Sequence, residues 1–245
     1  MTDHFEDPQP KDPQPDGTTA HRERRRPRLI VFDVNETLSD MSPMAERFVS
    51  VGAPGHLAGT WFAGLLRDGF ALTLTGDNPS FAELAAQSLR PALAGLVPDL
   101  DSAVRHVMDG FAALPVHPDV VEGVRALHDM GITLVTLSNG AAGIARGLIE
   151  RNDLEPYVDR VLSVEDAPRW KPAATAYGYA VETCGVAAAE AMLVAVHPWD
   201  IHGAHRAGLS TGWLNRGGVD YPSFFDGPDV AAPSLPDLAR RLTDY

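Results

Sequence analysis

Apolar residues follow two spacings along this chain, and together these predict alternating strands and helices. A continuous apolar run from Leu29 to Phe32 is too short for a helix and contains β-branched residues, which is typical of a buried strand in a parallel sheet. Further short apolar runs predict strands over residues 132–137, 158–162, 192–196 and 211–214. Apolar residues three and four positions apart predict helices over residues 120–130, 142–151, 173–184, 201–208 and 235–242. This alternation predicts an α/β fold with a doubly wound parallel sheet.

The stretch between the first two predicted strands departs from this alternation. Helical spacing recurs there over residues 44–51, 55–72, 80–89 and 100–114, with Gly and Pro residues between the stretches. So many helices exceed a single crossover, and we predict a helical insert over residues 42–115 between two parts of a core, residues 28–41 and 116–245. Residues 1–27 are rich in Pro, Asp, Gln and Arg with almost no apolar side chains, so we predict a disordered tail.

Polar side chains stand where the predicted strands end. Asp33 follows the first strand, Ser138 and Asn139 follow the second, and Asp200 lies shortly after the strand at 192–196. Lys171 precedes a proline at the start of a predicted helix. Ligands of open α/β sheets bind outside the carboxyl ends of the strands, so these side chains are candidates for one site. Taken singly, Asp33 could cap a turn and Lys171 could be a surface residue before a helix, but their ordered recurrence favours a shared function.

The ordered set of Asp33, Ser138 with Asn139, Lys171 and Asp200 resembles the haloacid dehalogenase superfamily. The opening Phe-Asp-Val-Asn-Glu-Thr-Leu at residues 32–38 is most similar to the 2-haloacid dehalogenase branch. The resemblance extends from Leu29 to the C-terminus. It implies a Rossmann-like, doubly wound core with the helical insert acting as a cap.

The resemblance also implies a reaction. A buried carboxylate beside a cation stays ionised and can act as a nucleophile. Asp33 would attack the α-carbon of a small 2-haloacid, expel halide and form an aspartyl ester, which water then hydrolyses to give a 2-hydroxy acid. Lys171 would stabilise charge, and Asp200 would position or activate the water. The expected substrate-binding and supporting residues are Asn35, Thr37, Ser138, Asn139, Tyr177, His197 and Arg67.

Phosphatases of the same superfamily carry a second Asp two residues after the nucleophile, as a general acid. That position is Asn35 here, which cannot donate a proton in that way. Their Mg²⁺ is held partly by acidic residues of the fourth motif, where this chain keeps only Asp200. Halide leaves as an anion without needing a proton, so we expect dehalogenation, with no metal and no other cofactor.

Two departures from the family pattern keep alternatives open. The fourth motif has His197 where a family asparagine often stands, and this histidine is either a base or donor near the water or a structural residue before Pro198. The cap arginine that grips halide in the family aligns near Ala53, and the nearest replacements are Arg67 and His56. The alternatives are therefore a small-molecule phosphatase with His197 as its acid, or a catalytically degenerate binding protein on the same fold.

Charge and composition narrow the partners. A formal net charge of -13 argues against a nucleic-acid binder, whose surface would be basic. No apolar run is long enough to span a membrane, and no signal peptide opens the chain. The single Cys184 cannot form an intramolecular disulfide. We therefore expect a cytoplasmic protein with a small-molecule substrate and neither nucleic acid nor membrane as partner, and we leave a homodimer open.

Overall fold

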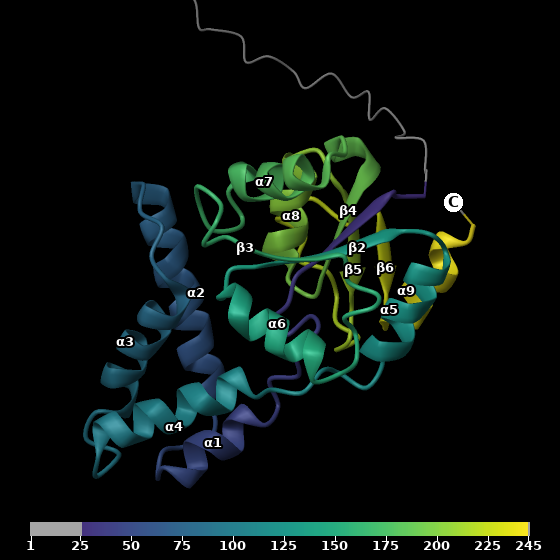
Figure 1. Cartoon of the computed structure of the whole chain (residues 1–245). Helices are drawn as coiled ribbons and strands as arrows, with labels where there is room; N and C mark the ends of the chain where they lie inside the picture. The colour runs from purple at the N-terminus through teal and green to yellow at the C-terminus, as the bar shows by residue number, and fades with distance from the viewer. Residues whose placement is uncertain (1–25, 245) are drawn as a thin grey trace, which may run out of the picture.

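The computed structural model describes residues 26–244 (Figure 1). The predicted disordered tail, residues 1–27, lies outside the described residues apart from Arg26 and Pro27. No helix between residues 26 and 244 has both the length and the apolar character that crossing a membrane requires.

A parallel sheet forms the centre of the described chain, with strand order β3-β2-β1-β4-β5-β6. The strands are β1 (Leu29–Phe32), β2 (Thr133–Ser138), β3 (Arg160–Ser163), β4 (Ala191–Ala195), β5 (Ser210–Leu214) and β6 (Val230–Ala232). The first strand, β1, lies between β2 and β4, with Leu29 opposite both Thr133 and Ala191. Successive strands are added on one side of β1 and then on the other, so the point at which a doubly wound sheet binds its ligand lies at the end of β1.

Helices cover both faces of this sheet (Figure 1). The apolar residues of β1 alternate, with Leu29 and Val31 in one core cluster and Ile30 and Phe32 in the other. Helices α7 (Ala174–Cys184) and α8 (Pro198–Arg206) pack on the first face, and α5 (Val120–Asp129), α6 (Ala142–Glu150) and α9 (Leu235–Leu242) pack on the second. A short 3-10 helix, Ala188–Glu190, precedes β4. The predicted α/β class with a doubly wound sheet is confirmed.

The helical insert lies beside the sheet as a layer of its own (Figure 1). It contains α1 (Met44–Ser50), α2 (Leu57–Thr75), α3 (Phe81–Leu93) and α4 (Leu100–Ala112). Aromatic rings hold these helices together: the ring of Phe111 on α4 lies 5.9 Å from Trp61 and 5.6 Å from Phe81. We call residues 42–115 the helical layer. Its buried side chains belong to the same apolar cluster as those of α7 and α8.

The two linkers between the sheet and the helical layer run side by side. The N–H of Asp40 donates to the carbonyl of Pro115 at 2.8 Å, and the N–H of His117 donates to that of Leu38 at 2.9 Å. Ser39 and Val116 form an antiparallel bridge between these bonds. The chain therefore leaves the core and returns to it at adjoining points.

Some helices begin or end at residues other than those predicted from the local sequence. The predicted end of the third helix at residue 89 is wrong, because α3 continues through Pro91 to Leu93. A proline removes one N–H donor, but Leu89 and Leu93 are both fully buried, and this packing holds the last turn. The eighth helix begins at Pro198, three residues before the predicted start, because proline suits the first turn of a helix. The three-residue strand β6 is too short to give a sequence pattern.

Candidate active site

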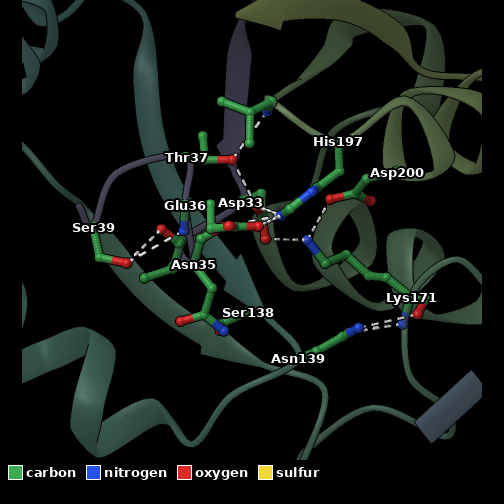
Figure 2. A network of polar contacts seen from close by, with 12 residues as sticks. Asp33, Asn35, Glu36, Thr37, Ser39, Ser138, Asn139, Lys171, His197 and Asp200 are labelled. Carbon is green, nitrogen blue, oxygen red and sulfur yellow. Dashed lines mark hydrogen bonds and ion pairs between the residues drawn. The ribbon is translucent and has the colours of Figure 1, made fainter. Parts of the chain in front are cut away.

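The candidate site lies where β1, β2 and β4 end (Figure 2). Asp33 follows β1 directly, and its N–H donates to the carbonyl of Val194 in β4 at 3.0 Å, which continues the ladder by one residue. Asp200 enters from the first turn of α8, and Lys171 comes from the loop before α7. The side chains of these three residues, far apart in the sequence, meet at this edge.

Lys171 joins the two carboxylates. Its Nζ lies 2.9 Å from Oδ1 of Asp33 and 2.6 Å from Oδ2 of Asp200, and its side chain is 0% exposed. Burial would raise the pKa of Asp33, but the charges of Lys171 and His197 and a hydrogen bond from Thr37 bring it below its usual value. Burial opposes the charged form of Lys171, yet the two carboxylates raise its pKa above the ordinary range. The site therefore holds Asp33 as a carboxylate beside an ammonium ion.

Thr37 fixes the orientation of Asp33. Its Oγ1 donates to Oδ2 of Asp33 at 2.6 Å and accepts the N–H of Val196 at 3.1 Å. The hydroxyl has one proton to donate, and the bond from Val196 leaves that proton for the carboxylate. The structure thus brings Thr37 to the contact through which it would orient the nucleophile.

Tyr177 and Lys171 occupy both carboxyl oxygens of Asp200. The Tyr177 hydroxyl donates to Oδ1 of Asp200 at 2.6 Å, while Lys171 binds Oδ2. Burial raises the pKa of Asp200; the Lys171 charge opposes this rise and the Asp33 charge adds to it. Burial and the neighbouring Asp200 also raise the pKa of Tyr177 well above its usual value. Tyr177 therefore stays a neutral donor that braces Asp200.

Asn139 lies at the site, where its side-chain amide bonds to the main chain of Lys171. Its Nδ2 donates to the carbonyl of Lys171 at 3.1 Å, and its Oδ1 accepts the N–H of Lys171 at 2.9 Å. Lys171 main-chain atoms bind Oδ1 and one N–H of Nδ2, and Nδ2 carries a second N–H, so a role of the Asn139 amide in holding substrate stays a prediction. The neighbouring Ser138 is buried, and its Oγ accepts the N–H of Gly140 at 2.8 Å.

His197 lies above Asp33 (Figure 2). Its Nε2 is 3.2 Å from the carbonyl oxygen of Asn35, 3.5 Å from Oε2 of Glu36 and 3.7 Å from Oδ2 of Asp33. The ring stacks on Trp199, with centroids 5.1 Å apart. Asn35 thus contacts His197 through its main chain, while its side chain is buried.

Glu36 is a site residue that sequence reasoning did not single out. It has a backbone φ of 61°, a left-handed conformation that is uncommon for residues other than Gly, Asn and Asp. The sequence shows a glutamate within the polar turn after β1, but the direction of its side chain depends on this backbone angle.

The structure does not bring Arg67 together with Asp33, Lys171 and Asp200, so substrate binding by Arg67 stays a prediction. Its side chain is 76% exposed and pairs with Asp68 at 2.8 Å, beside a surface hollow of about 250 Å³ between α2 and α3. Arg67 is two residues after the buried Leu65, which places it about 200° around α2. The α2 residue that reaches the site is Phe70, whose ring lies 4.9 Å from Trp199.

The helical layer also holds the loop that carries Lys171. The adjacent residue, Trp170, donates from Nε1 to the carbonyl of Pro79 at 3.0 Å, and its ring stacks 5.7 Å from Phe81. A Cβ added at Gly69 would lie 2.2 Å from the Trp170 ring, so only glycine allows this approach. Trp170 therefore belongs to the packing of the helical layer, while its neighbour Lys171 belongs to the site.

The donor set does not fit a metal between the two aspartates. The Lys171 ammonium bridges Asp33 and Asp200, so their facing oxygens already bind a cation. Residues 26–244 contain no group of three or more His, Cys, Asp or Glu side chains placed to hold a metal ion.

Comparison with known proteins places the chain in a family. A family model described as haloacid dehalogenase-like hydrolase matches residues 27–208. The chain is 30% identical over 225 residues to (S)-2-haloacid dehalogenase 1 of Pseudomonas sp. (strain CBS-3), covering 88% of this chain and 98% of that one. It is 27% identical over 217 residues to haloacetate dehalogenase H-2 of Moraxella sp. (strain B), covering 87% and 96%.

Solved structures agree with this placement. An L-2-haloacid dehalogenase is 29% identical, with a TM-score of 0.84 over 89% of this chain and 100% of the other. A dehalogenase with an intermediate complex is 26% identical, with a TM-score of 0.82 over 88% and 97%. The resemblance inferred from the motifs is confirmed, and the chain belongs to the haloacid dehalogenase-like hydrolase family.

Proposed function

We propose that this protein is a dehalogenase that converts a small 2-haloacid to a 2-hydroxy acid through an ester of Asp33. The observation that carries the proposal is the ionised Asp33, held by Thr37 at 2.6 Å and Lys171 at 2.9 Å, with Asn35 where a phosphatase would need an acid. The relatives named as haloacid dehalogenases support the same chemistry. The structure of a dehalogenase with an intermediate complex supports a route through an intermediate.

The reaction has two halves. A carboxylate oxygen of Asp33 attacks the α-carbon, and the carbon–halogen electron pair leaves with the halide, so no proton donor is needed. Water then attacks the carboxyl carbon of the ester, which releases the hydroxy acid and restores Asp33. Lys171 balances the charge on Asp33, and Asp200 is the group nearest to Lys171 that can take the proton of the water.

The surroundings suit a small substrate. We include in this proposal that residues 42–115 act as a cap, because Phe70 reaches over Trp199 at 4.9 Å and Trp170 lies against Gly69. The side chain of Asp33 is only 5% exposed, which favours a substrate of few atoms. A small-molecule substrate and a cytoplasmic location are part of the same proposal, and a homodimer stays a prediction.

Halide release is the direct test. Purified protein is incubated with chloroacetate, bromoacetate, fluoroacetate and 2-chloropropionate, and free halide is followed over time. We expect release from at least one of these acids without added metal. No release from any of them, with or without a divalent metal, would overturn the proposal.

The same assay separates the two alternatives. A phosphatase would hydrolyse an aryl phosphate in a Mg²⁺-dependent way, but the position of its acid is Asn35 and Lys171 bridges the two aspartates. A degenerate binding protein would not require the buried pair of Asp33 and Lys171. Neither alternative is favoured by a contact in the site.

A further inference from the structure

The surroundings of His197 determine which role its ring can play. Nε2 faces the carbonyl oxygen of Asn35 at 3.2 Å, Oε2 of Glu36 at 3.5 Å and Oδ2 of Asp33 at 3.7 Å. All three neighbours are hydrogen-bond acceptors while both acids are ionised. The network therefore assigns a hydrogen to Nε2, so in this geometry that nitrogen is a donor and not a base.

Glu36 is held in place for this contact by its main chain. Its N–H donates to Oγ of Ser39 at 3.3 Å, and its carbonyl accepts from Nε2 of His117 at 2.9 Å. These bonds stabilise a left-handed backbone that costs a non-glycine residue about 1 kcal/mol. Burial raises the pKa of Glu36; the charge of His197 opposes this and that of Asp33 adds to it. Glu36 keeps this unfavourable backbone conformation next to His197, whose ring faces Asp33. This arrangement points to a shared function of Glu36 and His197.

The two oxygens of Asp33 have different neighbours. Oδ1 accepts from Lys171 at 2.9 Å, whereas Oδ2 accepts from Thr37 at 2.6 Å and faces Nε2 of His197. Two donors directed at one oxygen form the arrangement that stabilises an oxyanion in acyl transfer. Oδ1 is then the oxygen that attacks carbon, and Oδ2 is the carbonyl oxygen of the ester.

We infer that His197 donates a hydrogen bond from Nε2 to Oδ2 of Asp33 while the ester is hydrolysed, and that Glu36 is a positioning residue that keeps the hydrogen on Nε2. The inference rests on the proposed function, because it needs the ester. Water attacks the carboxyl carbon, and the carbonyl electron pair moves onto Oδ2. The bond from this carbon to Oδ1 then breaks, and Oδ1 leaves as the product hydroxyl. Of the two water protons, one ends on that hydroxyl and the other is taken by Asp200 and passed on to solvent, while the water oxygen stays in Asp33.

Single-turnover kinetics can separate the two halves of the reaction. Protein in excess is mixed with 2-chloropropionate, halide is measured by rapid quench, and the ester is measured as added mass on the peptide that contains Asp33. The variants are His197→Leu, His197→Gln and Glu36→Gln. The matched control is His106→Leu on α4, whose histidine contacts Ser50 and not the site.

The donor role predicts a step-selective loss. In His197→Leu, ester hydrolysis should slow about 100-fold, as on removal of an oxyanion donor, so the ester accumulates while halide release stays within about threefold of wild type. His197→Gln keeps an N–H donor near the Nε2 position and should recover to within about tenfold of wild type, because a flexible amide holds the donor less firmly than the stacked ring. Glu36→Gln should slow hydrolysis by about three- to tenfold, again without slowing halide release.

Three results would overturn the inference. Equal slowing of halide release and hydrolysis in His197→Leu would mean that the ring only supports the fold of the site. Equal loss in His197→Gln and His197→Leu would indicate a base, since glutamine can donate but cannot take a proton. A His106→Leu loss as large as that of His197→Leu would mean a general effect on stability. If the wild type releases no halide, both the proposed function and this inference fail. If the wild type releases halide and one of the three results above is found, the inference alone fails.

Discussion

The polar edge of the sheet and the helical layer above it contribute to the site in different ways. The core supplies its charges, with Asp33, Lys171 and Asp200 joined by bonds of 2.6 to 2.9 Å. The helical layer supplies an aromatic ring, Phe70 on Trp199, and a closely packed glycine, Gly69 under Trp170. Asp33, the proposed nucleophile, therefore has its charged partners in the core, and the helical layer contributes to the shape of the surroundings.

One contact between the two regions involves consecutive residues. Trp170 is fully buried among the aromatic side chains of the helical layer, and Lys171 is fully buried between two aspartates of the core. A displacement of the helical layer therefore acts on the charge of the site through one peptide bond. Variants in the two regions can test whether the charges of the site depend on the packing of the helical layer.

The largest effect is expected for Asp33→Asn. A neutral amide is a far poorer nucleophile than a carboxylate, so halide release should fall by about a thousandfold or more. The control is Asp40→Asn on the linker, whose carboxylate bonds only to Ser42 among the hydrogen bonds seen here. A single turnover in ¹⁸O-labelled water should leave label in the protein; label in the first product would mean that water attacks the substrate and that Asp33 is a base.

Gly69→Ala tests the contact between the regions. Its Cβ would lie 2.2 Å from the Trp170 ring, and we expect a loss of about 1–3 kcal/mol in the free energy of unfolding. Gly64→Ala on the same helix meets nothing within 4 Å and should gain up to about 1 kcal/mol from helix propensity. Urea unfolding of both variants measures this, and a stabilised Gly69→Ala would show that Trp170 moves freely.

Tyr177→Phe tests the bracing of Asp200 within the core. The Tyr177 hydroxyl donates to Oδ1 of Asp200 at 2.6 Å and so opposes the rise in the pKa of that carboxyl that burial causes. Removing it should raise this pKa further, and activity that needs ionised Asp200 should be lost at a higher pH on the acid side. We also expect kcat to fall about tenfold. Tyr179→Phe on the same helix is the control, and an unchanged acid limb in Tyr177→Phe would contradict the role.

The smallest effect is expected for Arg67→Ala. The arginine is exposed and paired with Asp68, so kcat and KM for the haloacid should stay within about twofold of wild type. Steady-state halide release measures both constants. A KM raised tenfold or more would show that Arg67 contributes to substrate binding. The helical layer would then supply a charged group to the site.

The sequence predicted the core side of this comparison better than the helical side. Asp33 could be placed because an apolar run of four residues before a polar turn determines where the strand ends. The meeting of Lys171 with Asp33 followed from the family resemblance and not from spacing. Arg67 was selected as a cation near the position of the family's cap arginine, and sequence spacing alone does not show that its side chain lies on the exposed face of α2. The partners of Asn139 lie 32 residues away on the main chain of Lys171, a pairing that leaves no pattern in the sequence.

The side-by-side linkers have a consequence for how this protein can be rebuilt. Two backbone hydrogen bonds, from Asp40 to Pro115 and from His117 to Leu38, join the linkers at the two ends of the helical layer. Because loop-closure entropy grows slowly with length, segments of very different size can be exchanged at this junction if their own ends meet. A graft must also replace the contacts with the core, among them those of Gly69 and Phe81 with Trp170 and of Phe70 with Trp199. A transplanted segment therefore needs ends that meet at this junction, and it needs surfaces that pack against Trp170 and Trp199.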